Sequence, residues 1–193
     1  MGIEHNGRPS AIPAGEGLNV FALVIYIPGQ LGRFLDDLRR ELVPHYNPHA
    51  HVSVLPPRPL HVPWPVASEQ ARNLIEGWTR FDIELTGIQT FPVTEVIYLE
   101  VGAGASELFR MHSAMNSGDL AFDEPFQYHP HITLAQEVPH AEVPAIHELA
   151  RRRWEEYRGC RSFAADRAFF VQNMKTDCWM DLAEYSLGAV PVK

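Results

Sequence analysis

Apolar residues recur along the chain in two patterns, one typical of buried strands and the other of amphipathic helices. Residues 18–27 form a continuous apolar run that ends at Pro28, which predicts a buried strand. In residues 31–43 apolar side chains recur every three or four positions, which predicts a helix that ends before Pro44. The first half of the chain continues with a predicted strand at 49–55, a helix at 68–80 and a strand at 81–91.

The same order of elements then begins again. The second half has predicted strands at 95–101 and 129–135, helices at 105–117 and 141–157, and two closing strands at 161–171 and 178–187. Two halves of matching plan predict a duplicated, bilobal α+β fold. We expect two small, mostly antiparallel sheets that face a central cleft, with the helices outside.

The predicted elements form one domain. No linker rich in Gly or Ser separates the two halves, so residues 18–187 are expected to fold as one unit with lobes of about 18–92 and 93–187. Residues 1–17 are rich in Gly and Pro and contain no apolar run, which predicts a flexible N-terminal arm.

One short motif occurs in the third predicted element of each half. Residues 49–53 and 129–133 both follow the pattern H-x-H-x-[ST]. Because side chains alternate along a strand, the polar residues of each motif share one face and the apolar residues between them suit a core. These polar residues are His49, His51 and Ser53 in the first motif, and His129, His131 and Thr133 in the second.

Paired histidines and hydroxyls suit the cleavage of a phosphodiester. Histidine titrates at about 6.5, so two of them can supply one base and one acid near neutral pH. Hydroxyl groups can donate hydrogen bonds to the non-bridging phosphate oxygens, where charge develops in the transition state. The near-symmetry of the two motifs leaves open which histidine is the base.

The doubled motif resembles the two-histidine (2H) phosphoesterases, which include 2′-5′ RNA ligase-like proteins and cyclic phosphodiesterases. The matching segments are HVSVLPP at 51–57 and PHITLA at 130–135. The resemblance implies a bilobal fold and metal-independent hydrolysis or transesterification of 2′,3′-cyclic or 2′-5′ phosphodiesters. It also implies that His51 and His131 are catalytic and that Ser53 and Thr133 bind phosphate.

Further residues near the motifs are candidates for contact with the substrate. Arg58 follows the first motif and could reach a phosphate, or lie on the surface. Phe126 and Tyr128 precede the second motif and could stack on a base or pack in the core. His49 and His129 share the predicted active face by strand parity and are expected to contact the substrate or support the catalytic pair.

The many histidines also raise a metal site as an alternative. Alternate histidines on a strand can bind zinc or a similar ion. However, few carboxylates lie near the motifs in sequence, so we expect neither a metal nor another cofactor. The histidines that could take part in such a site are His45, His49, His51, His61, His129 and His131. A third hypothesis is a protein that binds a nucleotide or RNA end without turning it over.

Charge and composition restrict the partners. The formal net charge of −8 argues against a protein that grips long nucleic acid, because such binding depends on Lys and Arg. We therefore expect a small phosphodiester or nucleotide, or a short RNA end, as substrate. No apolar run is long enough for a membrane span or signal peptide, and Cys160 and Cys178 form no CxxC pair. These features predict a cytoplasmic protein without a membrane partner.

Overall fold

The computed structural model of the protein describes residues 17–43, 49–175 and 178–188. The predicted N-terminal arm lies outside these residues, except for Gly17. The elements are, in chain order, β1 (Gly17–Tyr26), α1 (Gly29–Leu42), β2 (His51–Arg58), α2 (Trp64–Ile75), β3 (Phe81–Thr90), β4 (Ile97–Val101), α3 (Ala105–Met115), η1 (Gly118–Leu120), β5 (His131–Ala135), η2 (His140–Glu142), α4 (Val143–Glu156), β6 (Ser162–Ala165), β7 (Arg167–Met174) and β8 (Trp179–Ser186).

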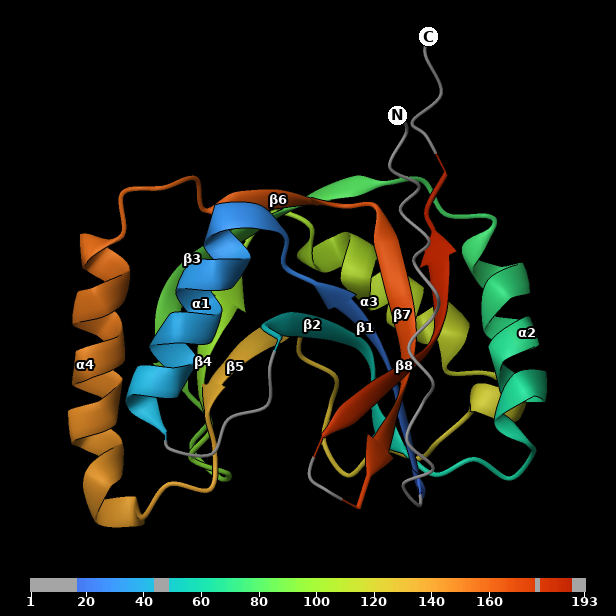
Figure 1. The fold of residues 1–193 in the computed structure, drawn as a ribbon, viewed down its shortest axis with the longest axis horizontal. Helices are drawn as coiled ribbons and strands as arrows, with labels where there is room; N and C mark the ends of the chain where they lie inside the picture. Colours follow the sequence, from blue (N-terminus) through green and yellow to red (C-terminus); the bar gives the residue numbers. More distant parts are fainter. Residues whose placement is uncertain (1–16, 44–48, 176–177, 189–193) are drawn as a thin grey trace, which may run out of the picture.

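The strands form two four-stranded sheets, ordered β2-β1-β7-β8 and β5-β4-β3-β6, and neighbouring strands in both are antiparallel. This confirms the predicted α+β fold with two antiparallel sheets. In Figure 1, α1 and α4 lie on one flank of the molecule and α2 lies on the opposite flank. Among the described residues no helix is both long enough and apolar enough to cross a membrane.

The two sheets exchange strands between the halves of the chain. β3 belongs to the first half but pairs with β4 and β6, whereas β7 and β8 belong to the second half but extend the sheet of β1. A short connection joins β3 to β4, with the Phe91 amide donating to the Val96 carbonyl at 3.0 Å, so consecutive strands pair as a hairpin. The sheets therefore do not correspond to the predicted lobes of 18–92 and 93–187.

The predicted strands and helices have counterparts, although several of their bounds differ by a few residues. The predicted strand at 161–171 is divided into β6 and β7, which join different sheets. The helix predicted at 68–80 lies earlier, at Trp64–Ile75, and Pro65 occupies its first turn, where a proline costs no hydrogen bond. The two motif strands also begin later than predicted, at His51 and His131, and the first continues to Arg58.

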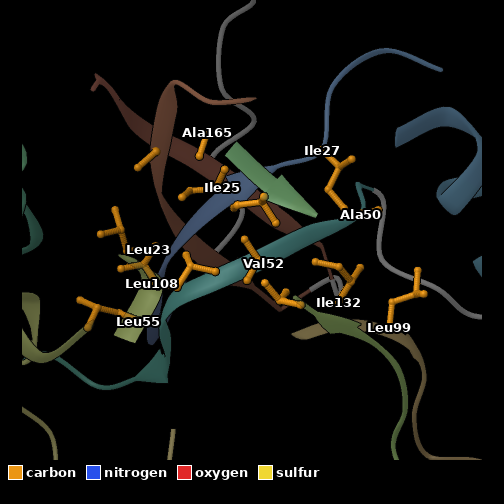
Figure 2. Close-up of a cluster of buried hydrophobic side chains, with 14 of the residues drawn as sticks. Leu23, Ile25, Ile27, Ala50, Val52, Leu55, Leu99, Leu108, Ile132 and Ala165 are labelled. Carbon is orange, nitrogen blue, oxygen red and sulfur yellow. The ribbon is translucent and has the colours of Figure 1, made fainter. Parts of the chain in front are cut away.

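One continuous apolar core joins the two sheets. Figure 2 shows Val52 of β2 and Ile132 of β5 within the same cluster as Leu23 and Leu99. Val52 and Ile132 are completely buried, and burial of such a side chain contributes roughly 1.5–3 kcal/mol. Because a shift of one residue would bring these side chains to the opposite face, core burial also fixes which face carries the polar residues of each motif.

Candidate active site

Both motif strands line one cleft of about 550 Å³. β2 contributes His51 and Ser53, and β5 contributes His131 and Thr133. The four residues predicted from the motifs therefore come together, although β2 and β5 belong to different sheets.

Both histidines have the same hydrogen-bonded orientation. Nδ1 of His51 lies 2.8 Å from the carbonyl oxygen of His49, and Nδ1 of His131 lies 2.6 Å from that of His129. A carbonyl oxygen only accepts, so Nδ1 carries the proton and donates it in each neutral ring. This tautomer leaves Nε2 of each ring with a lone pair that can accept a proton.

Burial lowers the pKa of both histidines. For His51 burial is the main cause of a pKa of about 4, and the positive charges of Arg39 and His131 lower it further. Its hydrogen bond to the His49 carbonyl and the carboxylate of Asp36 act in the opposite direction. Burial also lowers the pKa of His131, as does the charge of His129, against the opposing effects of the His129 carbonyl and Glu100. Burial therefore favours the neutral form of both rings in the free protein.

Aromatic rings lie beside each histidine. Phe91 stacks on Tyr98 at 4.0 Å between ring centroids, and both rings meet His131 edge-on, at 5.0 and 5.3 Å. Tyr26 meets His51 edge-on at 6.3 Å, and its hydroxyl donates to Asp181 at 2.6 Å. The sequence analysis missed these rings, although Tyr26 and Tyr98 both end up opposite a motif residue in the register of their neighbouring strands.

The outer histidines of the two motifs occupy different places. His129 lines the cleft, with Nε2 at 3.0 Å from a carboxylate oxygen of Glu100. His49 is exposed and does not line the cleft; its Nδ1 lies 3.4 Å from the Asp36 carboxylate. Strand parity fails for His49 because β2 begins only at His51.

Arg58, a predicted substrate contact, does not itself line the cleft but binds Glu124, which does. The strand does not stop at Leu55 but continues through two prolines to Arg58, whose side chain is buried. Its guanidinium donates to Glu124, to Asn116 Oδ1 at 2.8 Å and to carbonyl oxygens. The arginine therefore binds protein groups.

The two aromatic candidates before the second motif both line the cleft. Phe126 is 60% exposed, so its ring is accessible to a ligand. Tyr128 is engaged by the protein: its hydroxyl donates to the Ser53 carbonyl at 2.8 Å, and its ring stacks on His112 at 3.9 Å.

Arg39 is a cleft residue that the sequence analysis did not identify. It is buried at the edge of the cleft, near enough to His51 to lower its pKa, and its Nη1 lies 3.9 Å from Asp36. The signal was present, because Arg39 follows Leu35 by one helical turn and so lies on the buried face of α1. Trp179 of β8 also lines the cleft.

Within residues 17–43, 49–175 and 178–188, no three His, Cys, Asp or Glu side chains are grouped so that they could hold a metal ion. His45, one of the histidines considered for a metal site, lies outside the described residues. His61 is described but does not line the cleft.

The family model of the 2′-5′ RNA ligase superfamily matches residues 27–176 of the chain. The protein therefore belongs to this superfamily, which confirms the resemblance noted from the doubled motif. The matched region contains both motif strands and the whole sheet β5-β4-β3-β6, together with β2 and β7 of the other sheet.

Individual relatives agree with this assignment. A phosphoesterase-like protein of Geobacillus kaustophilus is 26% identical over 177 residues, which are 87% of this chain and 96% of that protein. An RNA 2′,3′-cyclic phosphodiesterase of Aeropyrum pernix is 35% identical over 94 residues, which are 45% of this chain and 53% of that protein.

Solved structures share the fold. A protein of Thermus thermophilus has a TM-score of 0.63 at 16% identity, over 89% of this chain and 100% of that chain. LigT of Escherichia coli in complex with 3′-AMP has a TM-score of 0.59 at 13% identity, over 88% of this chain and 98% of that chain. At these identities the likeness concerns the fold.

Proposed function

We propose that the protein is a metal-independent phosphodiesterase that acts on 2′,3′-cyclic nucleotides, or on RNA ends with a 2′-5′ or cyclic phosphodiester. The observation that carries this proposal is the pair of histidines with the same tautomer in one cleft. Family membership and the Aeropyrum pernix phosphodiesterase support the same reaction class.

The proposed reaction is acid–base hydrolysis. Nε2 of one neutral histidine takes a proton from water as the oxygen attacks phosphorus. The other histidine, in its protonated form, gives a proton from Nε2 to the 2′ or 3′ oxygen as the phosphorus–oxygen bond breaks. The products are a phosphate monoester and a ribose hydroxyl, and the protons balance after one exchange with water. Each such proton transfer accelerates the reaction roughly 10²–10⁴-fold.

Other cleft residues would stabilise the phosphate. Ser53 and Thr133 can donate hydroxyl hydrogen bonds to the non-bridging oxygens. Because burial favours the neutral form of both histidines, the positive charge of Arg39 would offset much of the phosphate charge.

The cleft favours a small substrate. Its volume of about 550 Å³ suits one or two nucleotides, and the net charge of −8 disfavours a long polyanion. Phe126, Trp179 and His129 lie around it and can contact a base or sugar.

The test is hydrolysis of 2′,3′-cyclic nucleotides in the presence of EDTA. We expect turnover by the wild-type protein and loss of roughly 10²–10⁴-fold in His51→Ala and in His131→Ala. The exposed His61 gives a matched control, and His61→Ala should keep full activity. Full activity in either cleft variant would contradict the assignment.

A nucleotide-binding protein without turnover is the second candidate. It is favoured by the lowered pKa of both histidines, because a pair that stays neutral lacks the acid. Calorimetry with a cyclic nucleotide, followed by analysis of the same sample for product, separates the two functions. Binding without product would support the second candidate.

A further inference from the structure

We infer that Tyr128 and Arg58 are positioning residues that hold residues 121–128, here called the cleft wall, against β2 and so fix the spacing of the two histidines. The effect on catalysis rests on the proposed function. The attachment of the cleft wall can be tested independently of it.

The cleft wall has no regular secondary structure. It lies between η1 and β5 and contributes several residues to the cleft lining, including Phe122, Glu124, Phe126 and Tyr128. No strand or helix hydrogen bonds hold such a segment, so other contacts have to fix its position.

Arg58 attaches the beginning of this segment to the end of β2. Its guanidinium donates to the Glu124 carboxylate, and its Nη1 donates to Asn116 Oδ1 and to the Leu120 carbonyl at 2.8 and 3.0 Å. Asn116 Oδ1 also accepts from the Phe122 amide at 2.8 Å. One buried cation therefore joins both ends of the turn that leads into the cleft wall.

Tyr128 attaches the other end of the segment directly to the first motif. Its hydroxyl donates to the main-chain carbonyl of Ser53 at 2.8 Å. Its ring lies flat on His112, with 3.9 Å between centroids and 3° between planes. His112 in turn has Nδ1 at 2.8 Å from the Val54 carbonyl. The Tyr128 hydroxyl and the His112 ring on which Tyr128 stacks therefore contact adjacent residues of β2, Ser53 and Val54.

This link matters because β2 and β5 share no sheet. The order β2-β1-β7-β8 and the order β5-β4-β3-β6 leave the two motif strands without main-chain pairing to each other. Tyr128 lies only three residues before His131, so its bond to Ser53 connects the two motifs over a short path. Catalysis is sensitive to such spacing, because a misplacement of about 1 Å can cost roughly 10²-fold in rate.

Tyr128→Phe is the most selective test, because it keeps the ring stack and removes one hydrogen bond. We expect kcat on a 2′,3′-cyclic nucleotide to fall about tenfold, with KM changed less than about twofold. Tyr157→Phe is the matched control, since the Tyr157 hydroxyl bonds to Cys160 outside the cleft. An unchanged kcat in Tyr128→Phe overturns the role in spacing.

Amide hydrogen exchange tests the attachment without reference to turnover. We expect faster exchange across residues 121–128 in Tyr128→Phe, and faster still in Arg58→Met, with the rest of the molecule protected as in the wild type. Arg167→Met, which removes an exposed pair with Glu184, is the control. Wild-type exchange rates in both cleft-wall variants overturn the proposal.

Failure of the proposed function can be distinguished from failure of the cleft-wall proposal. If the wild-type protein shows no turnover, the proposed function fails and the exchange rates alone decide on the cleft wall. If the wild-type protein is active and Arg58→Met is too unstable to purify, Tyr128→Phe still gives both readouts.

Discussion

The two motif histidines have the same tautomer but different surroundings. His51 lies near a cation, Arg39, which lowers its pKa. His131 lies at the edge of the stacked pair of Phe91 and Tyr98. The carboxylate of Glu100 opposes the lowering of its pKa by burial, as Asp36 does for His51. The duplicated motif thus gives both histidines the same tautomer, while the residues around each copy give the two rings different pKa values. Burial lowers the pKa of His51 furthest, to about 4, so we expect His51 to be the base and His131 the acid.

The largest effect should come from removing either histidine, and the leaving group should tell them apart. With a cyclic nucleotide, His51→Ala and His131→Ala should each lose roughly 10²–10⁴-fold in kcat/KM. With bis(4-nitrophenyl) phosphate, whose leaving group needs no proton, His131→Ala should recover most of its activity and His51→Ala should not. The opposite result would reverse the two roles.

The pH dependence of kcat/KM should lie on the acid side of neutral. One histidine must be protonated, and both pKa values are lowered from about 6.5, so we expect kcat/KM to fall about tenfold per unit as pH rises above 6.5. Because a bound phosphate favours the protonated form, the falling limb of kcat should lie at higher pH. A kcat/KM that rises from pH 6.5 to 8 would contradict these lowered values.

The same lowering has a consequence for stability at low pH. Below 6.5 the unfolded chain binds more protons at these histidines than the folded protein does, so folding becomes less favourable as pH falls toward 4. Thermal unfolding measured across this range should accompany the rate profile, so that loss of fold is separated from loss of the reactive form.

Replacing Arg39 should weaken the electrostatic difference between the two histidines. In Arg39→Met, removal of the positive charge should raise the pKa of His51 and increase KM about tenfold, since a charge-assisted contact is worth about 1.5–3 kcal/mol. Proton NMR titration of the two rings reports the pKa values directly. Arg40→Met, on the exposed side of the same helix, is the matched control and should leave the pKa of His51 and the KM unchanged.

The smallest effect is expected where the two motifs differ in their hydroxyl residue. Ser53→Thr would make the first motif match Thr133 and should change kcat/KM by less than about twofold, because the hydroxyl is kept and only rotamer freedom is reduced. Ser53→Ala should cost more than about tenfold. Equal activities in these two variants would show that the Ser53 hydroxyl takes no part.

Much of the candidate site could be predicted because it depends on short-range rules. Period-two alternation was sufficient to place His51, Ser53, His131 and Thr133 on one face, and the buried Val52 and Ile132 enforce that placement. The same rule failed for His49, which lies just before β2 begins, since parity holds only where the chain is a strand.

The features that escaped prediction depend on distant partners. Arg58 could not be placed from its position after the first motif, because its partners Asn116 and Glu124 follow α3, 58 and 66 residues later in the sequence. The exchange of β3, β7 and β8 between the sheets was equally hidden, because strand patterns indicate which face is buried but not which neighbour lies alongside. Arg39 was detectable from its helical spacing to Leu35 but was overlooked among the charged residues of α1.

The strand exchange also determines how the chain can be divided. A cut between β3 and β4 would separate strands that share main-chain hydrogen bonds and would leave each fragment with strands from two incomplete sheets. Neither fragment could bury its apolar face alone, whereas both together could complete the two sheets and the cleft. The loop at residues 91–96 is thus a suitable split point for a fragment-complementation reporter, in which cyclic-nucleotide turnover would signal that two fused proteins have met.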